Sequence, residues 1–197
     1  MPGRFLPSIT ESDGFGQRTI DPYSRLFKDR IVVVGGSLDD TAGNDVAVQL
    51  LHLDSDNPEH ELAIYLNCPD GTVSAALAIY DTIQSLTCEV ATVCLGEVGP
   101  TAALVLASGT PGKRKMLPSA RAILREPAME VNQGSAADLI RRADDLLRLR
   151  ARLEDLFAQH TGRTVSTVHD DLSRQLTLDA DGAVAYGIAD LVLRTGA

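Results

Sequence analysis

The chain has 197 residues, 44% of them hydrophobic and 23% charged, which predicts one globular domain with a sizeable core rather than two. Its formal net charge of -9 excludes nucleic acid as an expected partner, because an acidic surface repels phosphates. No apolar run approaches the roughly 20 residues that cross a bilayer, and no secretory signal pattern is visible at the N-terminus, so we expect a cytoplasmic protein without membrane contact.

The apolar pattern alternates between strands and helices along the chain. Residues 1–20 mix glycine, proline and hydroxyl residues, and they predict an extended or mobile arm. The elements expected beyond Pro22 are a helical turn over 24–29, a buried strand over 30–35, a helix from Asp39 or Asp40 to Pro58, a second buried strand over 62–67, a helix over 72–85, a strand over 89–95, a helix over 101–108, a strand over 120–124, helices over 135–160, 168–172 and 181–186, and a strand near 191–193. This order indicates an α/β protein with mainly parallel strands.

The helix predicted over residues 135–160 is unusually long, and Gly162 stops it. Such a helix extends about 39 Å, which is more than the core of this domain requires. Leucines recur every three or four residues on one face, and the other face is charged. The helix could project and pack against a partner, or it could lie in the core with a solvated outer face, and the residues alone leave both open.

Three cysteines, Cys68, Cys88 and Cys94, occur without a CxxC pair. This odd, scattered set predicts buried, reduced thiols and neither a disulfide framework nor a metal cluster. The four histidines also lack the spacing to a second histidine or cysteine that a metal site needs. We therefore expect no metal and no cofactor.

Two local patterns could carry chemistry, and both have an ordinary alternative. Gly35–Gly36 follows a predicted strand, but a nucleotide fingerprint needs further glycines there, so a turn is favoured. His169 precedes Asp170 and Asp171, which makes a possible base with an orienting acid. Adjacent residues rarely present both side chains to one reacting atom, so we favour surface polar residues.

Four stretches resemble the Clp peptidase family, and they occur in the family's order. They are PYSRLFKDRI (22–31), LNCPDGTVSAALAIYDTIQ (66–84), VCLGEVGPTAALVLASGTPGKRKMLPSARAIL (93–124) and AVAYGIAD (183–190). The resemblance runs from about residue 6 to 194, and actinobacterial members are the most similar kind. It implies an α/β, ClpP/crotonase-like fold with repeated β-β-α units and a protruding handle helix at about 135–160.

The same resemblance implies an assembly. Family members form heptameric rings that stack face to face, and the handle helix interlocks the two rings. Residues 1–20 would correspond to an N-terminal axial arm that gates the pore, and residues 21–197 to a single domain. The expected partners are an active paralogue, further copies of this chain and, weakly or through the partner ring, a Clp ATPase.

The family hydrolyses peptide bonds with a Ser-His-Asp triad, and the resemblance puts three other residues at those positions. Pro100 takes the place of the serine, Arg125 that of the histidine and Gln175 that of the aspartate. Proline carries no nucleophile, and arginine, with a pKa above ~12, accepts no proton at neutral pH. Glutamine carries no charge to stabilise an imidazolium. The sequence therefore predicts a pseudo-peptidase.

The oxyanion-hole positions implied by the resemblance are Asp70 and Thr101. The family's Pro-Gly-Gly reads Pro-Asp-Gly at 69–71, so a carboxylate stands where a developing oxyanion would need stabilising. We expect Arg125 to close the former site by contacting Gln175 or a nearby acid.

For ATPase docking, the resemblance points to a hydrophobic cleft between neighbouring subunits. The matching positions that keep apolar or aromatic character are Leu51, Tyr65, Val93, Leu95 and Leu117, whereas His52, Ala63 and Ser85 are smaller or more polar than is usual there. Because hydrophobic anchors carry most of such binding, we expect weak docking on this subunit. A rearrangement of the core is the alternative explanation.

The favoured function is a non-catalytic subunit of an ATP-dependent Clp protease complex that works beside an active paralogue. Two alternatives stay open. One is a free-standing homo-oligomer with a binding or scaffold role. The other is a weak residual serine-type peptidase that uses a hydroxyl of Thr101, Ser74 or Ser108.

Overall fold

A computed structural model describes residues 7–13, 16–127 and 135–194 of the chain. Five strands of its main sheet run parallel in the order β3-β4-β5-β6-β9. They span Ile31–Gly35, Leu62–Cys68, Val90–Val98, Arg114–Met116 and Leu191–Val192. The end of β5 also pairs with β7 (Arg121–Leu124), which pairs antiparallel with β8 (Leu176–Asp179), so the sheet branches there. The parallel sheet is as predicted, whereas β6 and β8 were not predicted.

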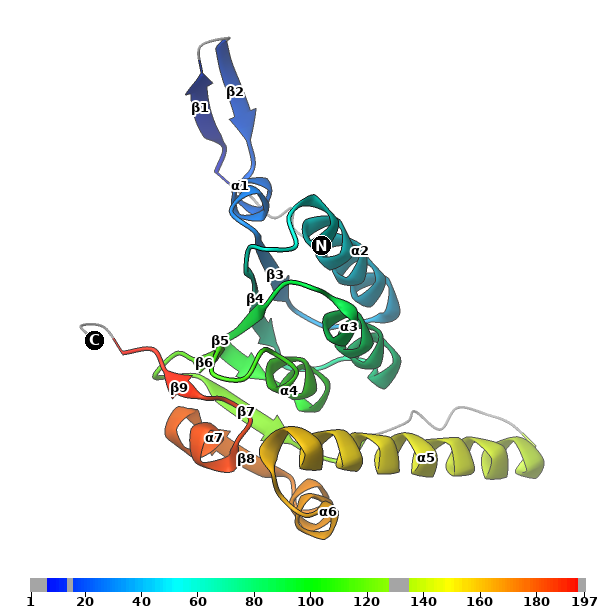
Figure 1. Cartoon of the computed structure of the whole chain (residues 1–197). Helices are drawn as coiled ribbons and strands as arrows, with labels where there is room; N and C mark the ends of the chain where they lie inside the picture. The colour runs from blue at the N-terminus through cyan, green and yellow to red at the C-terminus, as the bar shows by residue number, and fades with distance from the viewer. Residues whose placement is uncertain (1–6, 14–15, 128–134, 195–197) are drawn as a thin grey trace.

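Seven helices occur within the described ranges. They are α1 (Pro22–Lys28), α2 (Asp40–Asp56), α3 (Val73–Ser85), α4 (Pro100–Ala107), α5 (Ala136–Thr161), α6 (Val165–Ser173) and α7 (Ala180–Tyr186). Figure 1 shows α2, α3 and α4 along one side of the sheet, and each packs against the next. α4 then packs against α5, so the helices form a continuous layer.

Side-chain caps decide where most of these helices begin. A side chain at the N-cap accepts a first-turn amide at six helices, and the capping residues are Asp21, Asp39, Thr72, Ser135, Thr164 and Asp179. At α4 the N-cap is Gly99, which has no side chain to do so, and Pro100 follows at the first helical position. The first amides of α4 are therefore left without a side-chain acceptor.

The core is built around α4. All eight of its residues are buried, so this helix has no solvated face. On the neighbouring strand, the buried Thr92 hydroxyl donates to the Leu106 carbonyl at 2.7 Å, which satisfies the polar atom inside the core. Cys68, Cys88 and Cys94 are also buried and free, as predicted.

Strands β3 and β4 bury alternate residues, and this corrects the prediction that they are buried strands. In β4, Leu62, Ile64 and Leu66 face the helices, while Tyr65 is partly exposed on the other face. A continuous run of apolar residues suggested burial on both faces. The second face is covered only in part, and it lines an apolar pocket described below.

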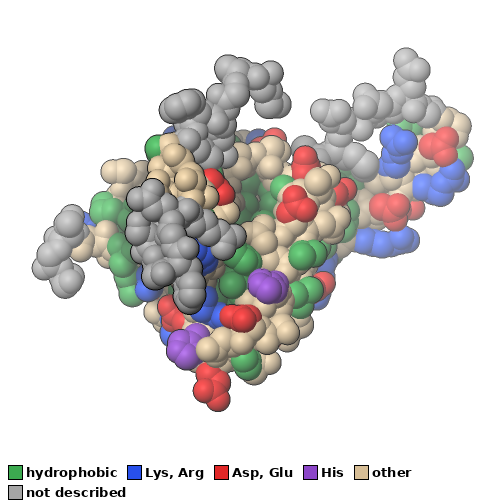
Figure 2. All heavy atoms as spheres, turned by 90° about the horizontal axis from the view of Figure 1, so that it is seen from above, with side chains coloured by type: hydrophobic (Ala, Val, Ile, Leu, Met, Phe, Trp, Pro, Cys, Tyr) green, Lys and Arg blue, Asp and Glu red, His purple; other side chains and the backbone are tan. Residues whose placement is uncertain are grey.

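Helix α5 projects beyond the rest of the molecule (Figure 1). Its buried residues lie in its second half, at Leu153, Glu154, Leu156 and Phe157. Ahead of them, apolar side chains such as Ile140 and Leu147 are more than 60% exposed. Figure 2 shows acidic and basic side chains gathered at the projecting end. Of the two arrangements that the sequence left open, the described residues adopt the projecting one.

The predicted N-terminal arm contains a β-hairpin. Strands β1 (Ile9–Asp13) and β2 (Gly16–Ile20) pair antiparallel, with Ile9 opposite Ile20, and the hairpin extends away from the sheet (Figure 1). An extended backbone was predicted, but strand pairing was not. Residues 1–6 and 14–15 of the arm, and 128–134 and 195–197 of the predicted domain, lie outside the described residues. The division into an axial arm and a single domain stays a prediction.

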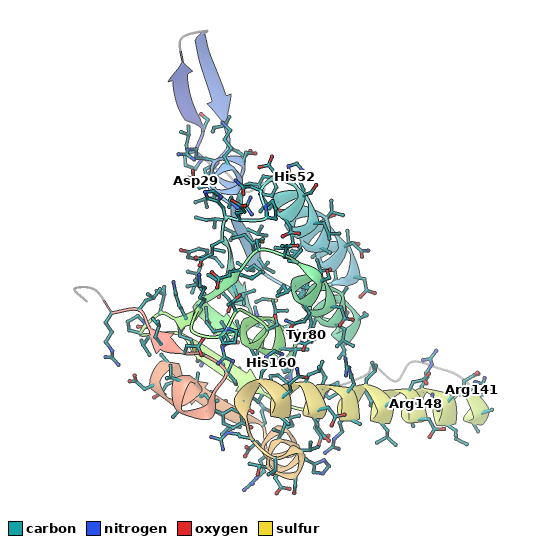
Figure 3. The ribbon with its side chains drawn as sticks, in the orientation of Figure 1. Asp29, His52, Tyr80, Arg141, Arg148 and His160 are labelled. Carbon is teal, nitrogen blue, oxygen red and sulfur yellow. The ribbon has the colours of Figure 1, made fainter. Side chains whose placement is uncertain are left out.

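His160 ties the base of α5 to α3. Its Nε2 lies 2.9 Å from the Tyr80 hydroxyl, and Figure 3 shows the two side chains pointing toward one another. The His160 carbonyl also accepts from Arg114 at 3.3 Å. Burial, with a smaller contribution from the Arg114 charge, lowers the pKa of His160 below its usual 6.5. The folded protein therefore holds this imidazole in its neutral form.

This lowered pKa predicts a stability change with pH. Since the unfolded chain binds the His160 proton more readily, stabilisation is complete above about pH 6.5 and is lost as the pH falls toward the lower folded value. We expect the melting temperature to fall less between pH 7.5 and 5.5 in His160→Gln than in the unchanged protein. His60→Gln, at an exposed position, is the control and should keep the original slope. An unchanged slope in His160→Gln would contradict the assignment.

Candidate functional site

Three backbone segments meet at the ends of β3, β4 and β5. The Leu38 amide donates to the Asp70 carbonyl at 2.9 Å, and the Leu38 carbonyl accepts from Thr72 at 2.8 Å. The Gly99 amide donates to the Cys68 carbonyl at 2.8 Å. The stretch between Cys68 and Thr72 is therefore fixed on both sides by backbone hydrogen bonds.

Two glycines permit this close approach. A Cβ on Gly99 would lie 2.0 Å from the Pro69 carbonyl oxygen, which no side chain tolerates. A Cβ on Gly71 would lie 2.7 Å from the Leu38 carbonyl oxygen and 2.9 Å from the Thr101 hydroxyl oxygen. Both positions therefore require glycine for steric reasons.

A pocket of about 620 Å³ opens beside this junction. Its lining residues are Ser37, Asp70, Gly71, Thr72, Val73, Ser74, Pro100, Thr101, Arg125, Glu126, Pro127, Asp145, Leu146 and Leu149. Four of the five residues predicted for the former catalytic site lie here, and Gln175 does not. We call this cavity the junction pocket. Among its lining residues there is no histidine and no cysteine.

Pro100 begins α4 directly after β5, as expected from proline's fit at a first helical position. The next two amides, of Thr101 and Ala102, have no hydrogen-bond acceptor within the described part of the chain, and the first intrahelical bond is donated by Ala103 to Gly99. The N-terminus of α4 thus presents free donors, and the aligned peptide dipoles add a partial positive charge.

The Thr101 hydroxyl is buried and unpartnered. The residue is only 5% exposed, and its Oγ1 finds no hydrogen-bond partner in the described residues. A buried hydroxyl without a partner costs roughly 1–3 kcal/mol. Among the described residues that line the pocket with it there is no imidazole to accept its proton, which an activated nucleophile requires.

Arg125 pairs with Asp70 across the junction pocket. The Arg125 Nη2 lies 3.4 Å from the Asp70 Oδ1, and the same oxygen accepts the Gly71 amide at 2.9 Å. Of the two contacts expected for Arg125, the one with an acid is present, and none with Gln175 occurs among the described hydrogen bonds. Both side chains are substantially exposed, so the ion pair contributes little to stability.

Gln175 lies apart from this group. It connects α6 to β8 with a left-handed φ of 53°, and its side chain is exposed. Asp171, the nearest preceding acid in the sequence, accepts the Tyr186 hydroxyl at 2.9 Å. Burial, followed by this carboxylate, raises the pKa of Tyr186 well above its usual range. Asp171 therefore holds Tyr186 of α7 and has a structural role.

Glu126, which lines the junction pocket, is held in place by a charged cluster that the sequence did not predict. The Arg150 Nη2 lies 2.9 Å from the Glu126 carboxylate, and the Ser173 hydroxyl donates to it at 2.7 Å. Arg150 also bonds Glu154 at 2.7 Å, and His169 Nδ1 lies 3.0 Å from the same Glu154 oxygen. His169 thus contacts α5 and not the acids that follow it. Of these contacts, the sequence indicated only the ion pair between Arg150 and Glu154, through their i,i+4 spacing on one helix.

The two serines considered as alternative nucleophiles have other partners. Ser74 donates to Asp40, and this bond, together with one from Thr72, lowers the pKa of Asp40. A carboxylate with a lowered pKa is a weak base. Ser108 is buried and donates to the Val105 carbonyl at 2.7 Å. Neither serine has an imidazole partner among the hydrogen bonds of the described residues.

A second, apolar pocket of about 450 Å³ lies on the other face of the sheet. Its lining residues are Pro22, Tyr23, Leu26, Ile31, Val33, Tyr65 and Leu95. Of the five positions predicted for ATPase docking, only Tyr65 and Leu95 take part. Val93 is 3% exposed, Leu51 lies exposed on α2, and Leu117 packs against the core. The sequence analysis did not predict that Pro22, Tyr23 and Leu26 of α1 line this pocket, because no pattern in that segment indicated a binding surface.

The structure is thus an α/β protein with a ligand-sized pocket where a helix begins at the ends of the parallel strands, and with one projecting helix. A family model described as Clp protease matches residues 14–196. An ATP-dependent Clp protease proteolytic subunit-like protein of Streptomyces coelicolor is 48% identical over 189 residues, covering 95% of this chain and 90% of that protein. ATP-dependent Clp protease proteolytic subunit 1 of Corynebacterium efficiens is 42% identical over 187 residues, with coverages of 95% and 90%. Subunit 4 of Streptomyces avermitilis is 40% identical over 190 residues, with coverages of 96% and 84%.

The chain belongs to the Clp protease family, a serine peptidase family whose similar members are named proteolytic subunits. This confirms the resemblance and the α/β, ClpP-type fold expected from it. In the described part of the chain, no helix is long and apolar enough to cross a membrane. The same residues contain no cluster of three metal-binding side chains.

The unpartnered hydroxyl predicts an unusual stability change. Thr101→Val should raise the free energy of unfolding by about 1 kcal/mol, because it removes a buried polar atom that gains no hydrogen bond. Thr92→Val is the matched control, and it should lower the free energy of unfolding by about 1 kcal/mol because that hydroxyl is bonded to Leu106. Chemical denaturation at a fixed protein concentration measures both. Equal destabilisation by the two substitutions would show that Thr101 has a partner.

Proposed function

We propose that this chain is a non-catalytic subunit of an ATP-dependent Clp protease complex. The observation that carries the proposal is the chemistry of the junction pocket, which holds Pro100 and Arg125 where a nucleophile and its base are expected. Proline has no hydroxyl, and a guanidinium keeps its proton at neutral pH. The hydroxyl of the next residue in the chain, Thr101, has no hydrogen-bond partner among the described residues.

The oxyanion hole supports the same proposal. The expected oxyanion-hole positions are Asp70 and Thr101, and the Asp70 carboxylate, which accepts the Gly71 amide, would oppose a negative charge developing beside it. Arg125 stabilises this carboxylate from the other side. We propose that the family's whole triad is replaced here, with Pro100 for the serine, Arg125 for the histidine and Gln175 for the aspartate. Loss of either the nucleophile or the base alone would already remove nearly all activity.

The projecting helix α5 supports a role in assembly. Family members work with Clp ATPases and with other subunits of the same kind in rings. We infer that α5 contacts a second ring, that the hairpin serves as the axial arm, and that an active paralogue supplies the catalytic centres. This chain would then contribute ring assembly, pore shape or regulation within a cytoplasmic barrel.

Docking of a Clp ATPase is proposed to be weak on this subunit. The apolar pocket beneath α1 retains Tyr65 and Leu95, which would suit a hydrophobic anchor. Leu51, Val93 and Leu117 do not line it in the single chain. A partner ring with a complete cleft would provide the stronger docking surface.

A free-standing homo-oligomer is the second candidate. Exposed apolar side chains on α2, at Val48 and Leu51, would suit contacts between identical copies as well as contacts with a paralogue. This candidate predicts the same ring size with and without the paralogue, whereas the leading proposal predicts mixed particles.

The proposal predicts that the purified chain is inactive and that a mixed complex is active only through its partner. We expect no cleavage of a fluorogenic peptide by this chain alone and no labelling by a fluorophosphonate probe. In a co-expressed complex, identified by native mass spectrometry, replacing the paralogue's catalytic serine with alanine should lower the rate of cleavage more than about a thousandfold.

Thr101→Ala in the same complex is the control, and it should leave cleavage within about twofold of the starting value. Labelling of the isolated chain that Thr101→Ala removes would contradict the proposal and support residual peptidase activity. Particles that never contain both subunits would favour the free-standing homo-oligomer.

A further inference from the structure

We propose that a pocket at the C-terminal end of α5 binds a small neutral molecule that carries a carboxamide group. The pocket has a volume of about 390 Å³ and lies where α3, α4 and α5 end. It shares no lining residue with the junction pocket or with the apolar pocket beneath α1. We call it the end pocket. The inference is independent of the proposed function, because it uses no residue of the former catalytic site.

The end pocket carries no charge at neutral pH. Among the described residues that line it there is no aspartate, glutamate, lysine or arginine, and the titratable ones are Cys88 and His160. Burial raises the pKa of Cys88 to about 11, so this side chain stays a thiol. Burial lowers the pKa of His160, so the imidazole stays neutral. A charged ligand would lose its hydration here without gaining a counter-charge.

The surroundings of the end pocket disfavour both signs of charge. The carbonyl ends of α3, α4 and α5 carry partial negative charge, which opposes an anion. Arg114 lies on the other side of His160, where its Nη1 donates to the His160 carbonyl at 3.3 Å. Its positive charge contributes to the lowered pKa of His160 and opposes a cation in the same way. The pocket therefore favours a neutral ligand.

His160 supplies a hydrogen-bond donor that a ligand can reach. Tyr80 is buried, and its hydroxyl has His160 Nε2, at 2.9 Å, as its one partner among the described residues (Figure 3). The phenol therefore donates to Nε2, which leaves the proton of the neutral imidazole on Nδ1. This Nδ1 has no partner in the described chain, where Thr101 Oγ1 is the one unpartnered side-chain atom that is fully buried. His160 Nδ1 is therefore open to solvent.

Two further side chains have hydrogen-bonding capacity to spare. The Gln84 amide nitrogen donates to the Ser108 carbonyl at 3.0 Å, which orients the side chain and leaves its Oε1 without a donor among the described hydrogen bonds. The Thr110 hydroxyl accepts the Val90 amide at 2.9 Å, and its own proton has no acceptor among them. The pocket thus offers an acceptor on Gln84 and donors on Thr110 and His160.

A carboxamide is the neutral group that complements this set. Its oxygen accepts from Thr110 and His160, and its NH₂ group donates to Gln84. The apolar part of the ligand would contact Ile83, Leu86 and Pro111, which also line the pocket. A volume of about 390 Å³ lies within the range of small-molecule sites. The ligand class is therefore a carboxamide on an apolar ring or short chain.

Three probes of nearly the same shape test the preference for a neutral ligand. They are the 4-fluoro derivatives of benzamide, benzoate and benzamidine, which differ in charge, and fluorine NMR at pH 7.5 measures their binding to the full-length chain. We expect saturable binding of the benzamide, at least about tenfold tighter than that of the benzoate and at least about threefold tighter than that of the benzamidine. Equal binding of the three, or no saturable binding of the benzamide, would overturn the inference.

Substitutions of Gln84 place the benzamide in the end pocket. Gln84→Leu removes the acceptor and should weaken benzamide binding at least about fivefold. Gln49→Leu on α2 is the matched control, because the Gln49 side chain also donates to a backbone carbonyl, that of Asp45, at 3.0 Å. It should leave binding unchanged. Equal effects of the two substitutions would show that the benzamide binds elsewhere, which contradicts the proposal.

Gln84→Glu gives the most specific result. The introduced carboxylate can pair with an amidinium, so this variant should bind the benzamidine more tightly than the benzamide and reverse the original order. His160→Phe keeps an aromatic ring without the donor, and it should weaken benzamide binding by about threefold or more. Circular dichroism confirms that each variant is folded. An unchanged order of affinities in Gln84→Glu would refute the assigned contact, and it would leave the proposed non-catalytic function unaffected.

Discussion

The structure depends on a close backbone contact at the ends of the parallel strands. Gly99 approaches the Pro69 carbonyl so closely that any Cβ would collide with it, and Leu38 holds the Asp70–Thr72 segment by two hydrogen bonds. These contacts fix the start of α4 inside the core, where Pro100 and Thr101 line the junction pocket. Proline at position 100 satisfies the geometry because this position needs no amide donor. The backbone around the junction pocket is thus held by close packing and backbone hydrogen bonds that do not depend on the side chains of Asp70 and Arg125.

The side chains on this scaffold form a different electrostatic arrangement from a serine peptidase. A permanent cation, Arg125, and a carboxylate, Asp70, face each other across the junction pocket, and the carboxylate takes the Gly71 amide. Behind them, Arg150 holds Glu126 to the base of α5. The charged side chains of the junction pocket are therefore paired, and the ion pair between Glu126 and Arg150 joins the pocket to the projecting helix α5. An arrangement of this kind suits recognition of charge better than transfer of a proton.

The sequence predicted most of the sheet and helix order, because apolar periodicity and caps are local signals. Helix α2 begins after Asp39 and α5 ends at Gly162, as expected, and the buried thiols followed from cysteine spacing. The short strands β6 and β8 escaped prediction because their pairing joins residues far apart in the chain. The Pro100, Asp70 and Arg125 grouping was predicted through the family resemblance, but the exclusion of Gln175 and the Arg150 cluster were not. Those features depend on side-chain orientation across α5, α6 and β8, which one sequence does not encode locally.

The first half of α5 carries apolar side chains, such as Ile140 and Leu147, that the described residues leave mostly exposed, and its start is held by the reciprocal cap at Ser135 and Asp138. Helical segments without tertiary support are only marginally stable in water. The order of this segment therefore depends on whether another surface covers it. In an assembly that covers this face, dilution into single chains would lower the helicity, so circular dichroism would follow dissociation although the sheet stays intact.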